Sequence, residues 1–232
     1  MSLKPKIYPF KNGDKMNHES WKQKGIENIG NFPAPFSAML ISHPNSGKTT
    51  LAKNLILHQT PEFERVLVVH HAPESTREYD DINVELTDEI PTKDDFDPNV
   101  KNLCILDDVY VKKLKPELEK RLERLFNYCR THMNVSIIIT TQDYSSIPPV
   151  IRRACNIFFV WKLRDKYSVK LLSKKIGVEE EDFKNLFKTI LINPHDSLCI
   201  DYTPHTPYKL RKNIFEPIEM DTEELEAGGE NS

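Results

Sequence analysis

Short apolar runs of strand length alternate with helical segments along most of this 232-residue chain. The runs lie at residues 36–41, 65–70, 102–106, 135–140 and 156–161. Segments with apolar residues at helical spacing lie at 47–58, 114–129, 166–176 and 179–191. Strands buried on both faces have continuous apolar runs, and parallel neighbours are joined by crossover helices. The alternation therefore predicts an α/β fold with a mainly parallel central sheet and helices on both faces.

Composition divides the chain into three expected parts. Residues 1–34 are polar and contain three glycines around a lone Trp21, which predicts an N-terminal arm with little regular structure. Residues 35–216 hold the apolar runs and form the expected folded domain, with two late strands at 197–202 and 208–210. Residues 217–232 are acidic and are predicted to be a disordered tail.

Charge is distributed unevenly although the formal net charge is only -3. Residues 111–175 carry fifteen Lys and Arg against five Asp and Glu, a local charge of +10. Residues 74–97 show the reverse, with ten acids against two bases. A basic face for polyanions is one interpretation of the first segment, and an ordinary solvated surface is the other.

Three classes of protein are disfavoured by the sequence. The four cysteines are far apart and form no CxxC pair, so we expect reduced, buried thiols and no zinc site or disulfide scaffold. No apolar run approaches the roughly 18 residues that a membrane helix needs, so no membrane span is expected. The first ten residues contain lysines but no apolar core of a signal peptide, so secretion is not expected.

A candidate phosphate-binding loop directly follows the first apolar run. Its residues are Ser42, His43, Pro44, Asn45, Ser46, Gly47, Lys48, Thr49 and Thr50. The segment resembles the Walker A loop, GxxxxGK[ST], in which backbone amides at a helix N-terminus surround phosphates. Lys48 would add a cation for the β- and γ-phosphates, and Thr49 would bind Mg²⁺. The segment therefore predicts a site for ATP and Mg²⁺.

Two features of this loop affect the strength of that prediction. Gly47 is the only glycine between Gly30 and Gly177, and it stands at the strand-to-helix turn, where a positive φ or a close ligand requires glycine. Ser42 replaces the first Walker A glycine, which weakens the inference without excluding it. The alternative is an ordinary strand–turn–helix in which Ser46 caps the helix.

Three polar residues at the ends of later runs extend the site. Asp107 and Asp108 follow the run 102–106 in the form of a Walker B motif. Asp107 is expected to hold Mg²⁺ through water beside Thr49, and Asp108 to orient and polarise an attacking water. Gln142 follows the run 135–140 and would sense the γ-phosphate if that strand lies between the other two. A simple polar strand end is the alternative for Gln142.

Two basic groups are candidates for contacts outside the chain's own site. Arg152 and Arg153 follow a proline turn, and such an exposed pair can act as an arginine finger in a neighbouring subunit. A surface pair that contacts acids or solvent is the alternative. Lys112, Lys113 and Lys115 follow the Walker B strand on an expected loop and are the first candidates for contacts with DNA phosphates.

These motifs, in this order and with a late SLCIDYT strand, resemble the DNA-packaging ATPases of large eukaryotic DNA viruses. These are the poxvirus-type packaging ATPases of the FtsK–HerA superfamily. The resemblance implies an ASCE-type P-loop NTPase core over residues 35–216, a homo-oligomeric ring, and ATP-driven movement of double-stranded DNA, without sequence specificity, into a preformed capsid. It also implies capsid or portal-vertex partners. The location implied is the host cytoplasm at the assembly site, the virion, or both, with the host nucleus left open.

The resemblance also implies a role for each matching residue. Lys48 and Thr49 would bind nucleotide and Mg²⁺, and Asp107 would be the acid on the metal side. Asp108 would be the base and Gln142 the sensor. Arg152 would be the arginine finger, with Arg153 competing for that role.

Several other functions remain open from the sequence. A DNA motor of plasmid or conjugation type, or a bacterial-virus packaging ATPase, would share the same motifs. A P-loop nucleotide or small-molecule kinase is disfavoured because Asp108 suits water better than an acceptor hydroxyl. A GTPase is disfavoured by the lack of an NKxD motif. A nucleotide-binding scaffold without turnover is disfavoured by the retention of both Asp107 and Asp108.

Overall fold

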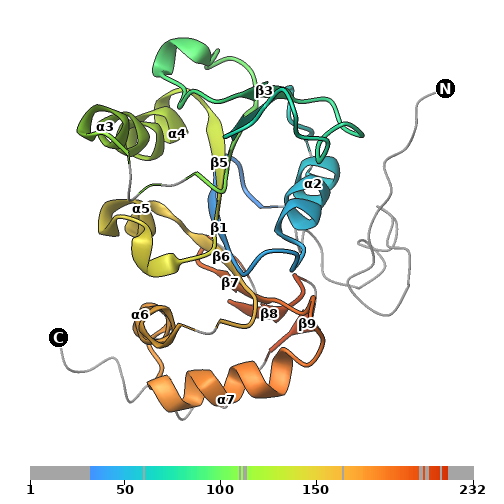
Figure 1. Cartoon of the computed structure of the whole chain (residues 1–232), viewed down its shortest axis with the longest axis vertical. Coiled ribbons are helices and arrows are strands. Elements are labelled where there is room, and N and C mark those ends of the chain that lie inside the picture. The colour runs from blue at the N-terminus through green and yellow to red at the C-terminus, as the bar shows by residue number, and fades with distance from the viewer. Residues whose placement is uncertain are drawn as a thin grey trace.

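The computed structural model describes residues 32–218, except for residues 60, 110, 112, 113, 164, 204, 205, 207, 208 and 215. Strands in this part form one sheet in the order β3-β2-β4-β5-β1-β6-β7-β8-β9 (Figure 1). Their bounds are β1 Ser37–Ile41, β2 Arg65–His70, β3 Glu85–Thr87, β4 Asn102–Asp107, β5 Val135–Thr141, β6 Ile157–Val160, β7 Leu198–Asp201, β8 Leu210–Lys212 and β9 Glu216–Pro217. All neighbours from β3 through β6 pair in parallel, which confirms the predicted class.

The order of the central strands decides where the site forms. β5 pairs with β1 on one side and with β4 on the other. The condition set for Gln142 is therefore met, since its strand lies between the two motif-bearing strands. The carboxyl ends of parallel strands meet at one edge, where ligands of open α/β sheets bind.

Helices cover both faces of the sheet. Their bounds are α2 Lys48–His58, α3 Pro116–Arg124, a π-helical turn Leu125–Cys129, α4 Arg130–His132, α5 Pro149–Ala154, α6 Lys166–Ile176 and α7 Glu180–Ile190. α2 lies on one face, where Leu51 packs with Ala38 and Leu40. α3 and α5 to α7 lie on the other face (Figure 1), where Phe126 belongs to the same core as Met39. Alternate residues of β1 thus enter opposite cores.

Three elements differ from the sequence prediction. β3 lies inside the acidic stretch 74–97, where a three-residue strand with polar neighbours leaves no apolar run. α5 forms where a proline loop was expected, because proline is compatible with the first turn of a helix. The last predicted strand, 208–210, is displaced to Leu210–Lys212. β7, β8 and β9 extend the parallel sheet in antiparallel fashion.

Most of both expected terminal segments lies outside the described residues. Phe32, at the end of the expected N-terminal arm, is buried in the α2-side core and stacks edge-on against Phe159. Pro217, where the expected tail begins, is the last residue of β9 and pairs with Arg211. Lys112 and Lys113 also lie outside the described residues, whereas Lys115 is exposed just before α3.

The cysteine and membrane expectations can be compared with the described part. All four cysteines are buried free thiols, and burial raises the pKa of Cys155 to about 12. A thiol with such a pKa is overwhelmingly protonated at neutral pH and therefore unreactive. Among the helices described, none combines the length and apolar character needed to cross a bilayer.

A buried ion pair joins the antiparallel strands β7 and β8. A guanidinium nitrogen of Arg211 donates to Oδ2 of Asp201 at 2.8 Å, and the two side chains are 2% and 3% exposed. The same guanidinium donates to the Thr206 hydroxyl at 3.1 Å and lies 5.8 Å from the Phe32 ring centroid. The pair therefore fixes the C-terminal strands and the residues that precede β1.

Removing one partner of this pair should destabilise the fold strongly. We expect Arg211→Met to lower the free energy of unfolding by about 3–5 kcal/mol, because Asp201 would stay buried without its cation. Urea denaturation of the full chain measures this change. The double variant Arg211→Met/Asp201→Asn should recover part of the loss. Additive losses in the double variant would contradict the coupling.

Candidate functional site

The turn between β1 and α2 has the conformation of a phosphate-binding loop. Gly47 has φ 106° and Asn45 has φ 60°, both in the left-handed region. The Ser46 hydroxyl donates to the carbonyl of His43 at 2.6 Å, and no side chain caps the helix after Gly47. The helix-cap alternative for Ser46 is therefore not seen. The first amides of α2 are therefore left without a capping side-chain acceptor, which is the arrangement that binds anions.

Lys48 and Ser42 complete the loop from inside. The Lys48 ammonium donates to the carbonyls of Ser42 at 3.3 Å and His43 at 3.4 Å, and its side chain is 7% exposed. Ser42 is fully buried, and its hydroxyl is 3.0 Å from the carbonyl oxygen of His43. The loop therefore accommodates serine in place of the first Walker A glycine by hydrogen bonding its hydroxyl within the turn.

Asp107 is a buried carboxylate with two hydrogen-bond donors. Tyr79 donates to its Oδ2 at 2.7 Å, and Thr140 donates to its Oδ1 at 2.8 Å. Burial raises the pKa of Asp107, while these two hydrogen bonds act in the opposite direction. The donors hold the carboxylate at the end of β4, where His70 is its register partner on β2.

Asp108 lies close to two other predicted site residues, Lys48 and Gln142. Its Oδ2 accepts from the Gln142 amide at 3.3 Å and is 3.9 Å from the Lys48 ammonium. Its backbone amide donates to the Thr140 hydroxyl at 2.8 Å, and its φ is 48°. The structure thus brings Lys48, Asp108 and Gln142 together at the carboxyl edge of the sheet, from the start of α2 and from the residues that directly follow β4 and β5.

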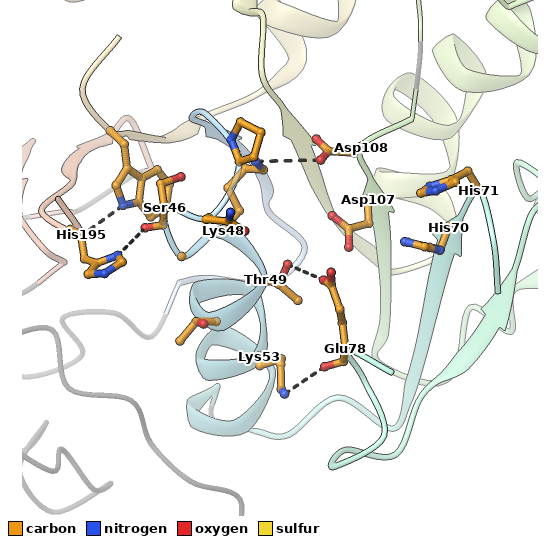
Figure 2. A pocket seen from close by; sticks show the side chains of 15 residues that line it. Ser46, Lys48, Thr49, Lys53, His70, His71, Glu78, Asp107, Asp108 and His195 are labelled. Carbon is orange, nitrogen blue, oxygen red and sulfur yellow. Dashed lines mark hydrogen bonds and ion pairs between the residues drawn. The ribbon is translucent and has the colours of Figure 1, made fainter. Parts of the chain in front are cut away.

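Thr49 faces an acid that the sequence analysis did not single out. Its hydroxyl donates to Oε2 of Glu78 at 2.9 Å (Figure 2). With Asp107 nearby, the oxygen donors here are of the kind that Mg²⁺ prefers. Among the described residues, no group of three or more His, Cys, Asp or Glu could hold a metal alone. The residues therefore fit a Mg²⁺ ion that shares its ligands with bound phosphates.

Lys48, Thr49, Glu78, Asp107 and Asp108 line one cavity of ≈ 670 Å³, whereas Gln142 borders a second cavity of ≈ 170 Å³ that Asp108 also lines. The wall of the larger cavity comprises most of the loop, the ends of β2 and β4, and four further side chains, which are Lys53, Glu78, Trp161 and His195. His195 Nδ1 lies 3.2 Å from the Ser46 carbonyl oxygen, and the Trp161 indole donates to the His195 carbonyl at 3.2 Å. The rings of His70 and His71 lie with centroids 4.3 Å apart at the β2 end.

The sequence analysis missed these lining residues for one reason. Lys53 lies on α2 and His70 ends β2, while the others follow a strand at the carboxyl edge or lie in a loop that returns to it, and none belongs to a recognised motif. The position of Glu78 and His71 after the second strand was the available signal, since loops at this edge gather ligand-binding residues.

The arginine pair lies outside the cavity wall. Arg152 is half-buried on α5, and its guanidinium carbon is 5.2 Å from the centroid of the Tyr144 ring. Arg153 is exposed on the same helix. The expectation of an exposed pair is therefore met only by Arg153, because Tyr144 holds Arg152 against the protein.

Comparison with known families gives one match. The model described as Poxvirus A32 protein matches residues 82–195, about half of the chain. This segment contains Asp107, Asp108, Gln142 and the arginine pair, and it begins after the loop 42–50. The match confirms the predicted resemblance to the poxvirus-type proteins. No curated protein sequence matches the chain.

Several solved structures share the fold. The DNA-packaging ATPase B204 of Sulfolobus turreted icosahedral virus is 17% identical with a TM-score of 0.57, over 80% of this chain and 99% of that one. The genome packaging NTPase B204 of Sulfolobus turreted icosahedral virus 2, in complex with ATP-gammaS, is 17% identical with a TM-score of 0.55. The match covers 83% of this chain and 100% of that one. The conjugation coupling protein TcpA of pCW3 is 11% identical with a TM-score of 0.55, over 82% and 62%.

The backbone of Gly47 provides a test of the loop. A Cβ at this position would meet only His195 Nδ1, at 4.0 Å, so Gly47→Ala would strain the backbone without a clash. We expect a loss of about 1–3 kcal/mol in the free energy of unfolding by urea denaturation. Gly177→Ala is the matched control, since Gly177 has φ 83° and open space around it. A similar loss in both variants, with nucleotide binding weakened only by Gly47→Ala, would support the loop assignment.

Proposed function

We propose that this chain, which matches the poxvirus A32 family over residues 82–195, is an ATP-hydrolysing motor that moves double-stranded viral DNA into a capsid. The observation that carries the proposal is the convergence of Lys48, Asp108 and Gln142 at one edge of the sheet. The solved structures with the same fold include DNA-packaging ATPases, one of them bound to an ATP analogue. Their likeness supports the fold, and the family match supports the function.

The residues divide the work of ATP hydrolysis by position. The loop amides and Lys48 would hold the β- and γ-phosphates, since both lie at the N-terminus of α2. Thr49 and Asp107 would hold Mg²⁺, which supplies positive charge to the phosphates when bound. Asp108 would orient the attacking water and accept its proton. Gln142, bonded to Asp108, would report the γ-phosphate to β5.

A cation on the phosphates and a base for water favour hydrolysis over transfer to an acceptor. The Asp108 side chain is 37% exposed, so water reaches the carboxylate. A kinase would need that access closed to water and an acceptor pocket in its place. The presence of both Asp107 and Asp108 favours an enzyme that hydrolyses ATP over a scaffold that only binds nucleotide.

Contacts with DNA would come from the basic segment 111–175. Six of its described lysines are exposed, and they are Lys115, Lys120, Lys162, Lys166, Lys170 and Lys174. Such residues contact phosphates and carry no sequence information, so the proposed binding is independent of sequence. A homo-oligomeric ring around the duplex and a capsid or portal-vertex partner complete the proposal, which places the protein at the site of virus assembly or in the virion.

A DNA motor of conjugation type is the second candidate. The likeness to TcpA of pCW3 supports it at the level of the fold. The match to the poxvirus A32 family favours packaging, because this match rests on sequence. Both candidates predict ATP hydrolysis that responds to duplex DNA.

An ATPase assay with and without duplex DNA tests this proposal, using size-resolved oligomer fractions. We expect duplex DNA to stimulate turnover by the wild-type chain. Lys48→Ala should abolish ATP binding because the phosphate cation is lost. Asp108→Asn should still bind ATP, but its turnover should fall about 100-fold or more, because the base is lost. Wild-type turnover in Asp108→Asn would make this residue structural.

Mixed rings test the arginine pair. We infer that Arg153, the exposed member, enters the neighbouring subunit's site, while Arg152 stays on Tyr144. Arg153→Ala should then bind ATP normally and lose about 10³-fold in turnover. Mixing it with Lys48→Ala subunits should restore part of the activity, because those subunits still donate Arg153. Rescue of Arg152→Ala instead would assign the finger to Arg152, and co-assembly without rescue of either would exclude a role in trans.

A further inference from the structure

The segment between β2 and β3 is held beside the candidate site by contacts with α2 and with the end of β4. The Lys53 ammonium of α2 donates to the Glu78 carbonyl at 3.0 Å and forms an ion pair with Asp81. Tyr79, 2% exposed, donates to Asp107 at 2.7 Å. Glu78 and Tyr79 are adjacent, so two consecutive residues contact α2 through a backbone carbonyl and the end of β4 through a side chain.

This attachment directs the Glu78 carboxylate into the cavity. Its Oε2 accepts from the Thr49 hydroxyl at 2.9 Å, and the side chain belongs to the cavity wall together with Asp107 and Asp108. Figure 2 shows Glu78 projecting from the side opposite α2 toward Thr49, with Asp107 above both. The oxygen donors of Thr49, Glu78 and Asp107 therefore come from three separate elements and border the same space.

We propose that Glu78 is a third carboxylate of the metal–nucleotide site and makes the site select Mg²⁺-bound nucleotide over free nucleotide. This inference rests on the proposed function of the same site. It assigns Glu78 to the metal side with Thr49 and Asp107, and it makes Tyr79 a positioning residue that sets the Asp107 carboxylate.

The balance of charges in the cavity supports this selection. Three carboxylates line it, from Glu78, Asp107 and Asp108. Lys48 lies 3.9 Å from Asp108, and Lys53 is already paired with Asp81. A free nucleoside triphosphate would bring its own negative charges against these carboxylates, whereas bound Mg²⁺ offsets both sets.

A different role for Glu78 would have a different signature. If Glu78 only occupied the Thr49 hydroxyl until nucleotide displaced it, then removing its charge would strengthen binding with and without Mg²⁺ by the same factor. If Glu78 only fastened the segment, then neither affinity would respond specifically to its charge. The ratio of the two affinities therefore separates the proposed role from the other two, and the affinities themselves separate those two from each other.

Binding of the ATP analogue AMPPNP to the full-length chain tests the proposal. Dissociation constants are measured by calorimetry in Mg²⁺ and in EDTA, for wild type, Glu78→Gln and the control Glu74→Gln. Glu74 is an exposed acid of the same segment outside the cavity wall. We expect the ratio of the EDTA constant to the Mg²⁺ constant to fall about tenfold or more in Glu78→Gln, the range for a residue supporting a metal site. Glu74→Gln should keep the wild-type ratio.

The possible outcomes separate a failure of the role of Glu78 from a failure of the proposed ATPase function. Glu78→Gln retains an oxygen that can accept from Thr49, so its unfolding transition should match that of wild type. An unchanged ratio, whether both affinities stay the same or rise by the same factor, would overturn the role of Glu78 while leaving nucleotide binding intact. Absence of AMPPNP binding by wild type in both buffers would overturn the proposed function and this inference with it.

Discussion

The Thr140 hydroxyl makes the hydrogen bonds on which the site depends. It donates to Asp107 at 2.8 Å and accepts from the Asp108 amide at 2.8 Å, so one group on β5 orients the last residue of β4 and the residue that follows it. A hydroxyl can do both at once because it has one donor and two acceptor lone pairs. These two hydrogen bonds are possible because β5 pairs directly with β4 in the sheet. The order of the strands therefore determines where the two acids lie, because it places Thr140 beside them.

The backbone at Asp108 shows the cost of that arrangement. Its φ of 48° lies in the left-handed region, which aspartate tolerates better than most residues. Asn45 and Gly47 adopt the same region in the loop after β1. Local strain of this kind persists where surrounding contacts fix it, and it gathers at ligand-binding sites. Here it turns the Asp108 side chain toward Lys48 and Gln142 instead of along the strand.

The parts that the sequence predicted are those with a local signal. The apolar runs predicted β1, β2, β4, β5 and β6, since continuous burial leaves a mark on composition. Lys48 and Asp108 were predicted to share a site because each follows such a run, and Gln142 was predicted to join them if its strand lies between the other two. Glu78 could not be predicted in the same way, because its role depends on how the loop after β2 folds back onto α2. Burial of Arg152 against Tyr144 is likewise a tertiary contact without a sequence pattern.

His195 joins the phosphate-binding loop to a distant part of the chain. Its ring lies 3.2 Å from the Ser46 carbonyl oxygen, and its own carbonyl accepts from Trp161, which directly follows β6. Residue 195 also precedes β7, the first antiparallel strand. A displacement of the loop by as little as the length of a hydrogen bond must therefore either break this link or pull β7 along with it. The loop is thus mechanically connected to the C-terminal strands without passing through the core.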